Sequence, residues 1–313
     1  MCGIYGWLKP IDEKKNIFPG HFDLAKILRD GLIETQSRGK DATGFYSPGT
    51  GIVKRSIPAT KFVPEFVPDN IADEPFVIGH CRQASASLGN KKEDLENDNN
   101  AHPFESKNWV LVHNGTVNLP KLKGYKYTSS VEGGKVVDSE SILAYIETTS
   151  LKNALSSLKG AATVIAYNKR EKKMYFWTDG NRPLAIGYYD GMVFFASTKQ
   201  ILKKSIKNIG SELGIFHKML FTTIYECELL EFDFAKCKFT RRGIIQPKPE
   251  IKAEEEDELD FLHSINGTKP AQLSLPAPFD YKPKTPGNKI IHINYNNNRP
   301  ALQRGCTPNP VRR

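Results

Sequence analysis

The stretch Met1–Leu8, MCGIYGWL, places a cysteine directly before a short apolar run. The run Gly3–Leu8 is typical of a buried β-strand. Cys2 is small, so we expect Met1 to be removed, which leaves Cys2 with both a thiol and a free α-amine. An α-amine has a pKa of about 7.7–8.0 and can act as the base for its own thiol. A cysteine at position 2 is accidental in most proteins, so the role of Cys2 as a nucleophile depends on the rest of the chain.

Short apolar runs separated by turns continue from this strand to about residue 240. Helical spacing of apolar residues predicts amphipathic helices over 21–35 and 138–148, and a short helix over 198–207. We expect strands at 76–80 and 109–113, an antiparallel meander of 163–167, 174–177, 184–188 and 192–196, and a closing hairpin of 222–232 with 236–241. Helices between groups of antiparallel strands predict a layered α+β fold.

Composition excludes several protein classes. Of the 313 residues, 39% are hydrophobic and 25% charged, and the net charge is +9. No apolar run reaches the ~18 residues that a membrane helix needs, and the N-terminus lacks a signal-like pattern. The five cysteines, at 2, 81, 227, 237 and 306, have no metal-site spacing and are odd in number. We therefore expect a cytoplasmic protein with no membrane span, no metal and no cofactor.

The composition changes near residue 240. We expect a folded domain over 2–242 and a mostly disordered tail over 243–313. Residues 254–260, EEEDELD, hold six acids in seven positions, and from Lys282 onward there are seven Lys or Arg and no acid. The run 289–294, KIIHIN, is a candidate docking strand. Nucleic-acid binding is disfavoured because the basic end lacks interleaved aromatic residues, although the positive charge leaves it open.

Five segments occur in an order and spacing that single out one family: MCGIYGW at 1–7, SRGKDATG at 37–44, GHCRQAS at 79–85, HNGTV at 113–117 and DSESILAYI at 138–146. Together they resemble the class II glutamine amidotransferases, which are N-terminal-nucleophile hydrolases, and most of all the glutaminase domain of glucosamine-6-phosphate synthase. The resemblance covers about residues 2–240. It implies a four-layer αββα sandwich of two antiparallel sheets, with Cys2 as nucleophile.

The same resemblance implies a binding site for L-glutamine. Arg82 matches the family's arginine, which suits the α-carboxylate because a guanidinium binds a carboxylate at two points. Ser85 matches a hydroxyl residue that adds to this contact. Asp138 matches the acceptor of the α-ammonium, with a plain helix N-cap as the competing interpretation. Asn114 and Gly115 match the oxyanion donors, with a type I′ hairpin turn as the competing interpretation.

The SRGKDATG loop resembles a supporting loop of the family. We expect Arg38 and Asp41 to pair there, with Gly39 allowing a turn. Two positions depart from the family pattern: Gln83 stands where a Trp is common, and Ala86 where a His is frequent. Both bear on glutamine affinity and on closure of the loop over the substrate.

The resemblance predicts an enzyme that hydrolyses the side-chain amide of glutamine through a Cys2 thioester, giving glutamate and ammonia. Beyond residue 240 too few apolar residues remain to build a synthetase domain, so we expect a separate acceptor enzyme to receive the ammonia. Two alternatives stay open. One is an N-terminal-nucleophile amidase for another amide, and the other is a non-enzymatic module that binds a partner.

Overall fold

The computed structural model describes residues 1–9, 23–84, 92–189, 191–207, 219–222 and 224–247. Several predictions lie outside these residues: the start of the first helix, Ser85, Ala86, the acidic block 254–260, the run 289–294 and Cys306. The tail predicted from residue 243 is described only as far as Pro247.

One sheet contains the N-terminal strand. It consists of β1 (Gly3–Leu8), β2 (Ala42–Ser47), β3 (Gly51–Arg55), β4 (Phe76–Arg82), β9 (Ala185–Tyr189), β10 (Met192–Ala196) and β11 (Leu220–Thr222), in the order β11-β9-β10-β1-β4-β2-β3. We call it sheet A, and all its pairs are antiparallel. The strand predicted from Gly3–Leu8 is confirmed at these bounds and lies in the middle of the sheet.

The second antiparallel sheet, sheet B, has the order β13-β12-β8-β7-β6-β5. Its strands are β5 (Phe104–Glu105), β6 (Trp109–Val117), β7 (Gly160–Asn168), β8 (Lys173–Thr178), β12 (Glu228–Asp233) and β13 (Lys238–Ile244). The helices are α1 (Leu24–Thr35), α2 (Ala59–Phe66), α3 (Lys92–Leu95), α4 (Asp138–Thr148), α5 (Leu151–Ser156) and α6 (Lys199–Lys207), with short 3-10 turns at Gln36–Arg38, Asp69–Asp73, Asp98–Asn100 and Glu132–Gly134.

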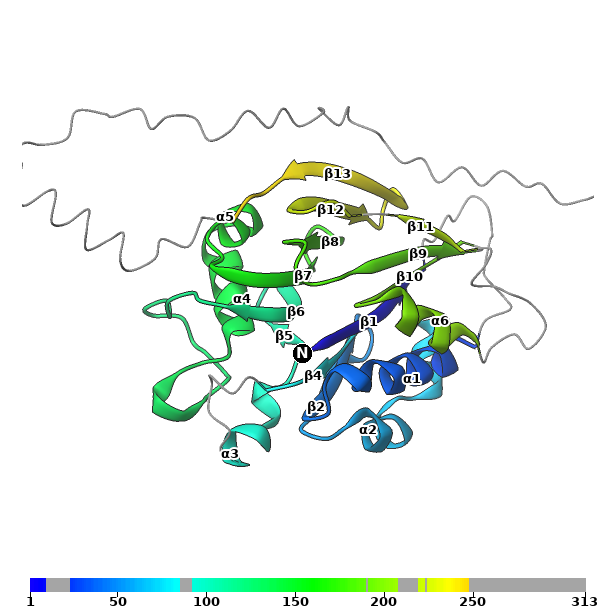
Figure 1. Cartoon of the computed structure of the whole chain (residues 1–313), viewed down its shortest axis with the longest axis horizontal. Coiled ribbons are helices and arrows are strands. Elements are labelled where there is room, and N and C mark those ends of the chain that lie inside the picture. The colour runs from blue at the N-terminus through cyan, green and yellow to red at the C-terminus, as the bar shows by residue number, and fades with distance from the viewer. Residues whose placement is uncertain (10–22, 85–91, 190, 208–218, 223, 248–313) are drawn as a thin grey trace, which may run out of the picture.

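Three apolar clusters define the layers. Tyr5 and Trp7 of β1 pack with α1, α2 and α6 on the outer face of sheet A. Ile4 and Leu8, which alternate with them, pack between the sheets against residues such as Phe176 of β8. A third cluster joins α4 and α5 to the outer face of sheet B. The predicted αββα sandwich is confirmed, and Figure 1 shows α4 and α5 on one side and α1, α2 and α6 on the other.

Strand pairing corrects two predictions. The expected four-strand meander is wrong: β7 pairs with β8 in sheet B, whereas β9 pairs with β10 in sheet A. Alternating patterns predict strands but do not say which sheet each one joins. The closing hairpin is confirmed as β12 with β13, but Thr222 belongs to β11 in the other sheet.

Ordered contacts continue a little past residue 242. Strand β13 continues to Ile244, and the buried Ile245 donates its backbone N–H to the carbonyl of Cys227. Within the described ranges, no helix is both long and apolar enough to cross a membrane.

Candidate active site

The candidate site lies where sheets A and B meet. Cys2 directly precedes β1, whose Gly3 pairs with Cys81 of β4. Both β1 and β4 contact β6 of sheet B, and Figure 1 shows the N-terminus at this meeting point. A small pocket here brings together residues from four predicted segments. Its lining is Cys2, Arg82, Gln83, His102, His113, Gly115, Thr116, Val137, Asp138 and Ser139.

The Cys2 thiol contacts the backbone of Gln83. Its Sγ lies 3.5 Å from the Gln83 carbonyl oxygen and 3.4 Å from the Gln83 nitrogen. Burial raises the pKa of the Cys2 thiol, while the Gln83 hydrogen bond and the Arg82 charge act in the opposite direction. The thiol is therefore protonated at neutral pH and needs a base before it can attack an amide.

Arg82 carries a buried cation into the site. The residue is 5% exposed, and its Nη1 has no hydrogen-bond partner among the described residues. Burial lowers the pKa of this guanidinium, whereas Cys2, Asp41 and Asp138 raise it. Since an unpaired buried donor is costly, this nitrogen is poised for an acceptor that enters the pocket.

Asn114 and Gly115 lie inside strand β6, opposite Thr163 and Ala162 of β7. The type I′ turn is therefore excluded. Gly115 has φ of 154°, and a Cβ there would lie 1.9 Å from the Ala161 carbonyl oxygen, so the position requires glycine. Asn114 is 1% exposed, and neither end of its amide has a partner within the described part of the chain. A buried amide with both ends unpaired is rare in folded proteins and points to a ligand.

Asp138 is the first residue of α4, and the N-cap is Val137. The interpretation of Asp138 as a plain N-cap is therefore wrong. One carboxylate oxygen accepts from the Val117 backbone N–H at 3.0 Å, and the other accepts from Ser139 N–H at 2.8 Å. Asp138 thus joins the end of β6 to the start of α4 and still lines the pocket.

A buried polar cluster of three histidines and a serine adjoins the pocket. The Ser139 hydroxyl lies 2.7 Å from His102 Nε2 and 3.0 Å from His113 Nδ1, and His80 Nε2 lies 3.0 Å from the His113 carbonyl oxygen. Burial lowers the pKa of all three histidines, that of His80 to about 3, so all are neutral at pH 7. His80 and His113 are thus buried, hydrogen-bonded residues of the core. His102 and Ser139 were missed because 37 residues separate them.

The supporting loop differs from its prediction. Arg38 and Asp41 do not pair with one another. Arg38 Nε donates to the Cys2 carbonyl oxygen at 2.9 Å. The Asp41 carboxylate accepts from Gln83 Nε2 and from the Ala84 backbone N–H. Gly39 is extended, with φ of −170°, so it makes no turn that needs glycine. Its Cβ would lie 2.4 Å from the Arg82 carbonyl carbon, so close packing excludes a side chain there.

In the ranges that the structure describes, no group of three or more His, Cys, Asp or Glu is arranged to hold a metal ion. Of the other cysteines that the structure describes, none lines the pocket. Cys81 is fully buried, and burial raises the pKa of its thiol to about 12. Cys227 and Cys237 do not face each other, because they lie at opposite ends of the β12–β13 hairpin.

Comparison with known proteins agrees with this geometry. A family described as "Glutamine amidotransferase domain" matches residues 91–204. Glutamine–fructose-6-phosphate aminotransferase (isomerizing) from Helicobacter pylori J99 is 26% identical over 66% of this chain and 34% of its own length. The protein of that name from Bacillus cereus ATCC 10987 is 28% identical, over 70% of this chain and 36% of its own. The chain thus spans about a third of these curated relatives.

Solved structures show the same fold. One described as the allosteric regulatory enzyme of purine biosynthesis superposes with a TM-score of 0.50 and 21% identity, over 78% of this chain and 50% of that chain. This likeness supports the two-sheet sandwich as the fold of this chain. Over residues 91–204 the chain is therefore similar to glutamine amidotransferase domains, and its fold is the two-sheet sandwich found in the enzyme of purine biosynthesis.

Proposed function

We propose that this domain hydrolyses the side-chain amide of L-glutamine to glutamate and ammonia, with Cys2 as nucleophile after removal of Met1. One observation carries the proposal. In the pocket that Cys2 lines, a buried guanidinium nitrogen of Arg82 lacks a partner among the described residues, and on β6, next to the pocket-lining Gly115, both ends of the Asn114 amide lack one too. Unpaired buried polar groups destabilise a fold unless a ligand satisfies them, so a polar substrate is the natural occupant.

The two ends of this pocket suit an α-amino acid. Arg82 binds the α-carboxylate, with Ser85 as a further proposed contact, and Asp138 accepts from the α-ammonium. The carboxylate and ammonium groups then direct the side-chain amide toward Cys2. A site for a simple amide needs neither charge, which disfavours a general amidase.

The reaction begins when the freed α-amine of Cys2 takes the thiol proton. Sγ attacks the amide carbon, and the negative charge that forms on the carbonyl oxygen is stabilised by the Asn114 side chain and the Gly115 backbone N–H. The amine returns the proton to the leaving nitrogen, the C–N bond breaks, and ammonia departs from a thioester. Water, deprotonated by the same amine, attacks this thioester, releasing glutamate and restoring the thiol.

Ser139 helps to fix the relative positions of the residues that act on the substrate. The Ser139 hydroxyl is within hydrogen-bond distance of both His102 and His113, and His113 directly precedes Asn114. The Ser139 backbone N–H donates to the Asp138 carboxylate. His80, two residues before Arg82 on β4, hydrogen-bonds the same segment of β6. The three elements that supply the oxyanion donor, the ammonium acceptor and the carboxylate-binding arginine are thus connected by a buried network.

We propose in addition that the ammonia passes to a separate acceptor enzyme, because the names of the curated relatives, glutamine–fructose-6-phosphate aminotransferases, pair glutamine with a second substrate. The proposal is tested by measuring glutamate release from glutamine with the Met1-processed chain. Activity in the parent chain and in Cys81→Ala, with none in Cys2→Ala, supports it. An active Cys2→Ala variant refutes it.

A further inference from the structure

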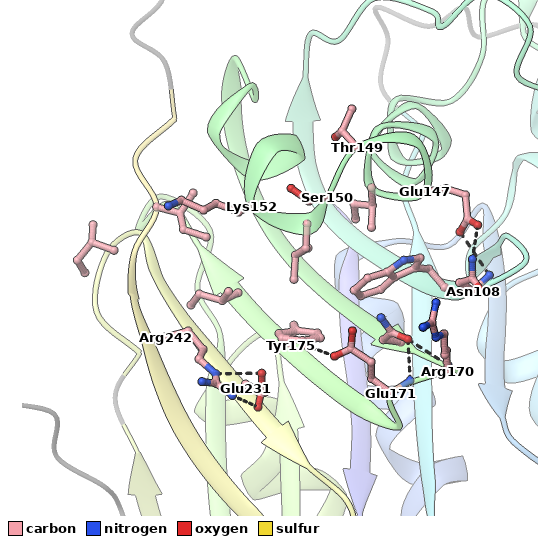
Figure 2. Close-up of a pocket in the computed structure, with 17 residues that line it drawn as sticks. Asn108, Glu147, Thr149, Ser150, Lys152, Arg170, Glu171, Tyr175, Glu231 and Arg242 are labelled. Carbon is pink, nitrogen blue, oxygen red and sulfur yellow. Dashed lines mark hydrogen bonds and ion pairs between the residues drawn. The ribbon is translucent and has the colours of Figure 1, made fainter.

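A second cavity, of about 550 Å³, lies on the outer face of sheet B, away from the Cys2 pocket. Figure 2 shows it between the α4–α5 connection and strands β8, β12 and β13. None of its lining residues belongs to the Cys2 pocket. We call it the sheet B groove.

The floor of the groove is apolar. Ile146, Leu229 and Ile245 belong to the cluster beneath α4 and α5, while Trp109 and Tyr175 pack against that cluster and remain only partly buried. Ile244 at the rim is 49% exposed. Concave apolar surface with a polar rim is typical of a binding site.

The acidic side chains of the groove are already engaged. Glu147 accepts from Ser106 and Asn108, and Glu231 accepts two hydrogen bonds from Arg242 (Figure 2). Glu171 Oε2 lies 3.5 Å from Lys173 Nζ.

Two cationic side chains of the groove form no ion pair with a described carboxylate. Lys152 on α5 and Arg170 in the β7–β8 turn are exposed, and within the described part of the chain neither has a carboxylate partner. The groove therefore offers an apolar floor and two cations to an occupant that is apolar and acidic.

The chain itself contains such a segment close by. Ile244 and Ile245 line the groove, and the described part of the chain continues only to Pro247. The acidic block 254–260 begins seven residues later and is followed directly by Phe261 and Leu262. Seven residues span up to about 25 Å, which is enough to turn back over the groove. A short connection also keeps the local concentration of the segment high, of millimolar order.

We propose that the sheet B groove binds residues 254–262 of the same chain, EEEDELDFL. Phe261 and Leu262 cover the apolar floor, and the preceding acids pair with Lys152 and Arg170. The basic end of the chain, including KIIHIN at 289–294, fits less well because its lysines and arginines meet the same two cations. This proposal does not rest on the glutaminase reaction, and glutamine hydrolysis is expected to proceed whether or not the groove is filled.

The test uses the full chain and a zero-length carbodiimide, which joins a carboxylate to an amine only when they are in contact. Equal amounts of unlabelled and ¹⁵N-labelled protein are mixed, cross-linked and analysed by peptide mass spectrometry. We expect Lys152 to link to residues 254–260 within one chain, so that linked peptides carry a single isotope. Lys61 on α2, exposed on the opposite outer layer, is the control amine and should give little of this product.

Two variants sharpen the test. Arg170→Glu and Phe261→Ser should each lower the yield of the Lys152 link at least threefold, while Lys123→Glu, an equal charge change at an exposed lysine between β6 and α4, should not. All three should keep the parent rate of glutamine hydrolysis.

Four outcomes would overturn the proposal: no Lys152 link, equal linking at Lys61, mixed-isotope links that show a second copy in the groove, or links from Glu147 or Glu171 to lysines beyond residue 281. None of these results bears on Cys2.

Discussion

The Cys2 pocket and the β12–β13 hairpin both bury charged and polar side chains, but they treat them differently. In the hairpin, Glu228 pairs with Arg241 and Glu231 with Arg242, so each buried carboxylate has a cation. In the pocket, Arg82 Nη1 lacks a partner in the described chain, and so does the amide of Asn114 on β6, the strand whose Gly115 and Thr116 line the pocket. Paired groups stabilise a fold, whereas unpaired ones are kept for a ligand. The two regions should therefore respond in opposite ways to mutation.

The largest expected effect on stability lies in the hairpin. Glu228→Ala removes the buried carboxylate that pairs with Arg241, whose side chain is 16% exposed. Breaking such a pair costs about 3 kcal/mol or more, so the denaturant midpoint should fall clearly. The rate of glutamine hydrolysis by the folded fraction should not change. Loss of activity in the folded fraction would show that the two regions are not independent.

The pocket should show the reverse. Asn114→Ala removes an amide that has no hydrogen-bond partner among the residues described, so the denaturant midpoint should stay close to that of the parent. The kcat for glutamine should fall by ~10²–10³, as it does when one oxyanion donor is lost, with little change in KM. A raised KM at unchanged kcat would instead assign Asn114 to substrate binding.

Arg82→Lys should act on binding. A lysine keeps the charge but cannot contact a carboxylate at two points, so KM for glutamine should rise by roughly 10-fold or more. Stability should not fall, because the orphaned guanidinium nitrogen is removed. Parallel losses of KM and stability would mean that Arg82 is a structural residue like those of the hairpin.

Ser139→Ala should lower the rate indirectly, by changing where the catalytic groups lie. It breaks the bridge between His102 and His113 and should lower kcat more than it raises KM, because Asn114 and Asp138 move relative to Cys2. Ser139→Thr keeps the hydroxyl and should restore most of the rate. If threonine fails to rescue kcat in a well-folded variant, the hydroxyl is not the positioning group.

The smallest effect concerns pH. Burial lowers the pKa of His80 to about 3, below its usual value near 6.5. The neutral form is favoured in the fold, so the stability it contributes is present above pH 6.5 and is lost as the pH falls toward 3. Thermal melting of the parent between pH 7 and 5 should show a falling Tm, and His80→Gln should flatten the slope. If Tm fell as steeply with pH in His80→Gln as in the parent, His80 would not be the source of the pH dependence.

The sequence predicted some elements at residue precision. The strand Gly3–Leu8 was visible because both its faces are buried, which makes every position apolar or small. Helix Asp138–Thr148 was visible from its acidic first turn and apolar spacing. The site residues Cys2, Arg82, Asn114 and Asp138 came from local motifs, and the fold brings the segments that carry them together.

Other features could not be predicted because they depend on tertiary pairing. The strands β8 and β9 have similar local patterns, yet they join different sheets. Arg38 was expected to pair with the nearest acid, but the fold offers it the Cys2 carbonyl instead. Ser139 resembled an ordinary first-turn residue until His102 and His113 were brought to it from other elements.

The central claim is that Cys2, and no other cysteine, is the nucleophile. The most direct measurement is mass spectrometry of the chain after treatment with a glutamine-like electrophile that carries a reactive ketone in place of the amide. We predict that Met1 is absent, that one equivalent is attached at Cys2, and that excess glutamine prevents the reaction. Attachment at Cys81 or Cys306 instead, or labelling of Cys2 that glutamine does not slow, would contradict the account.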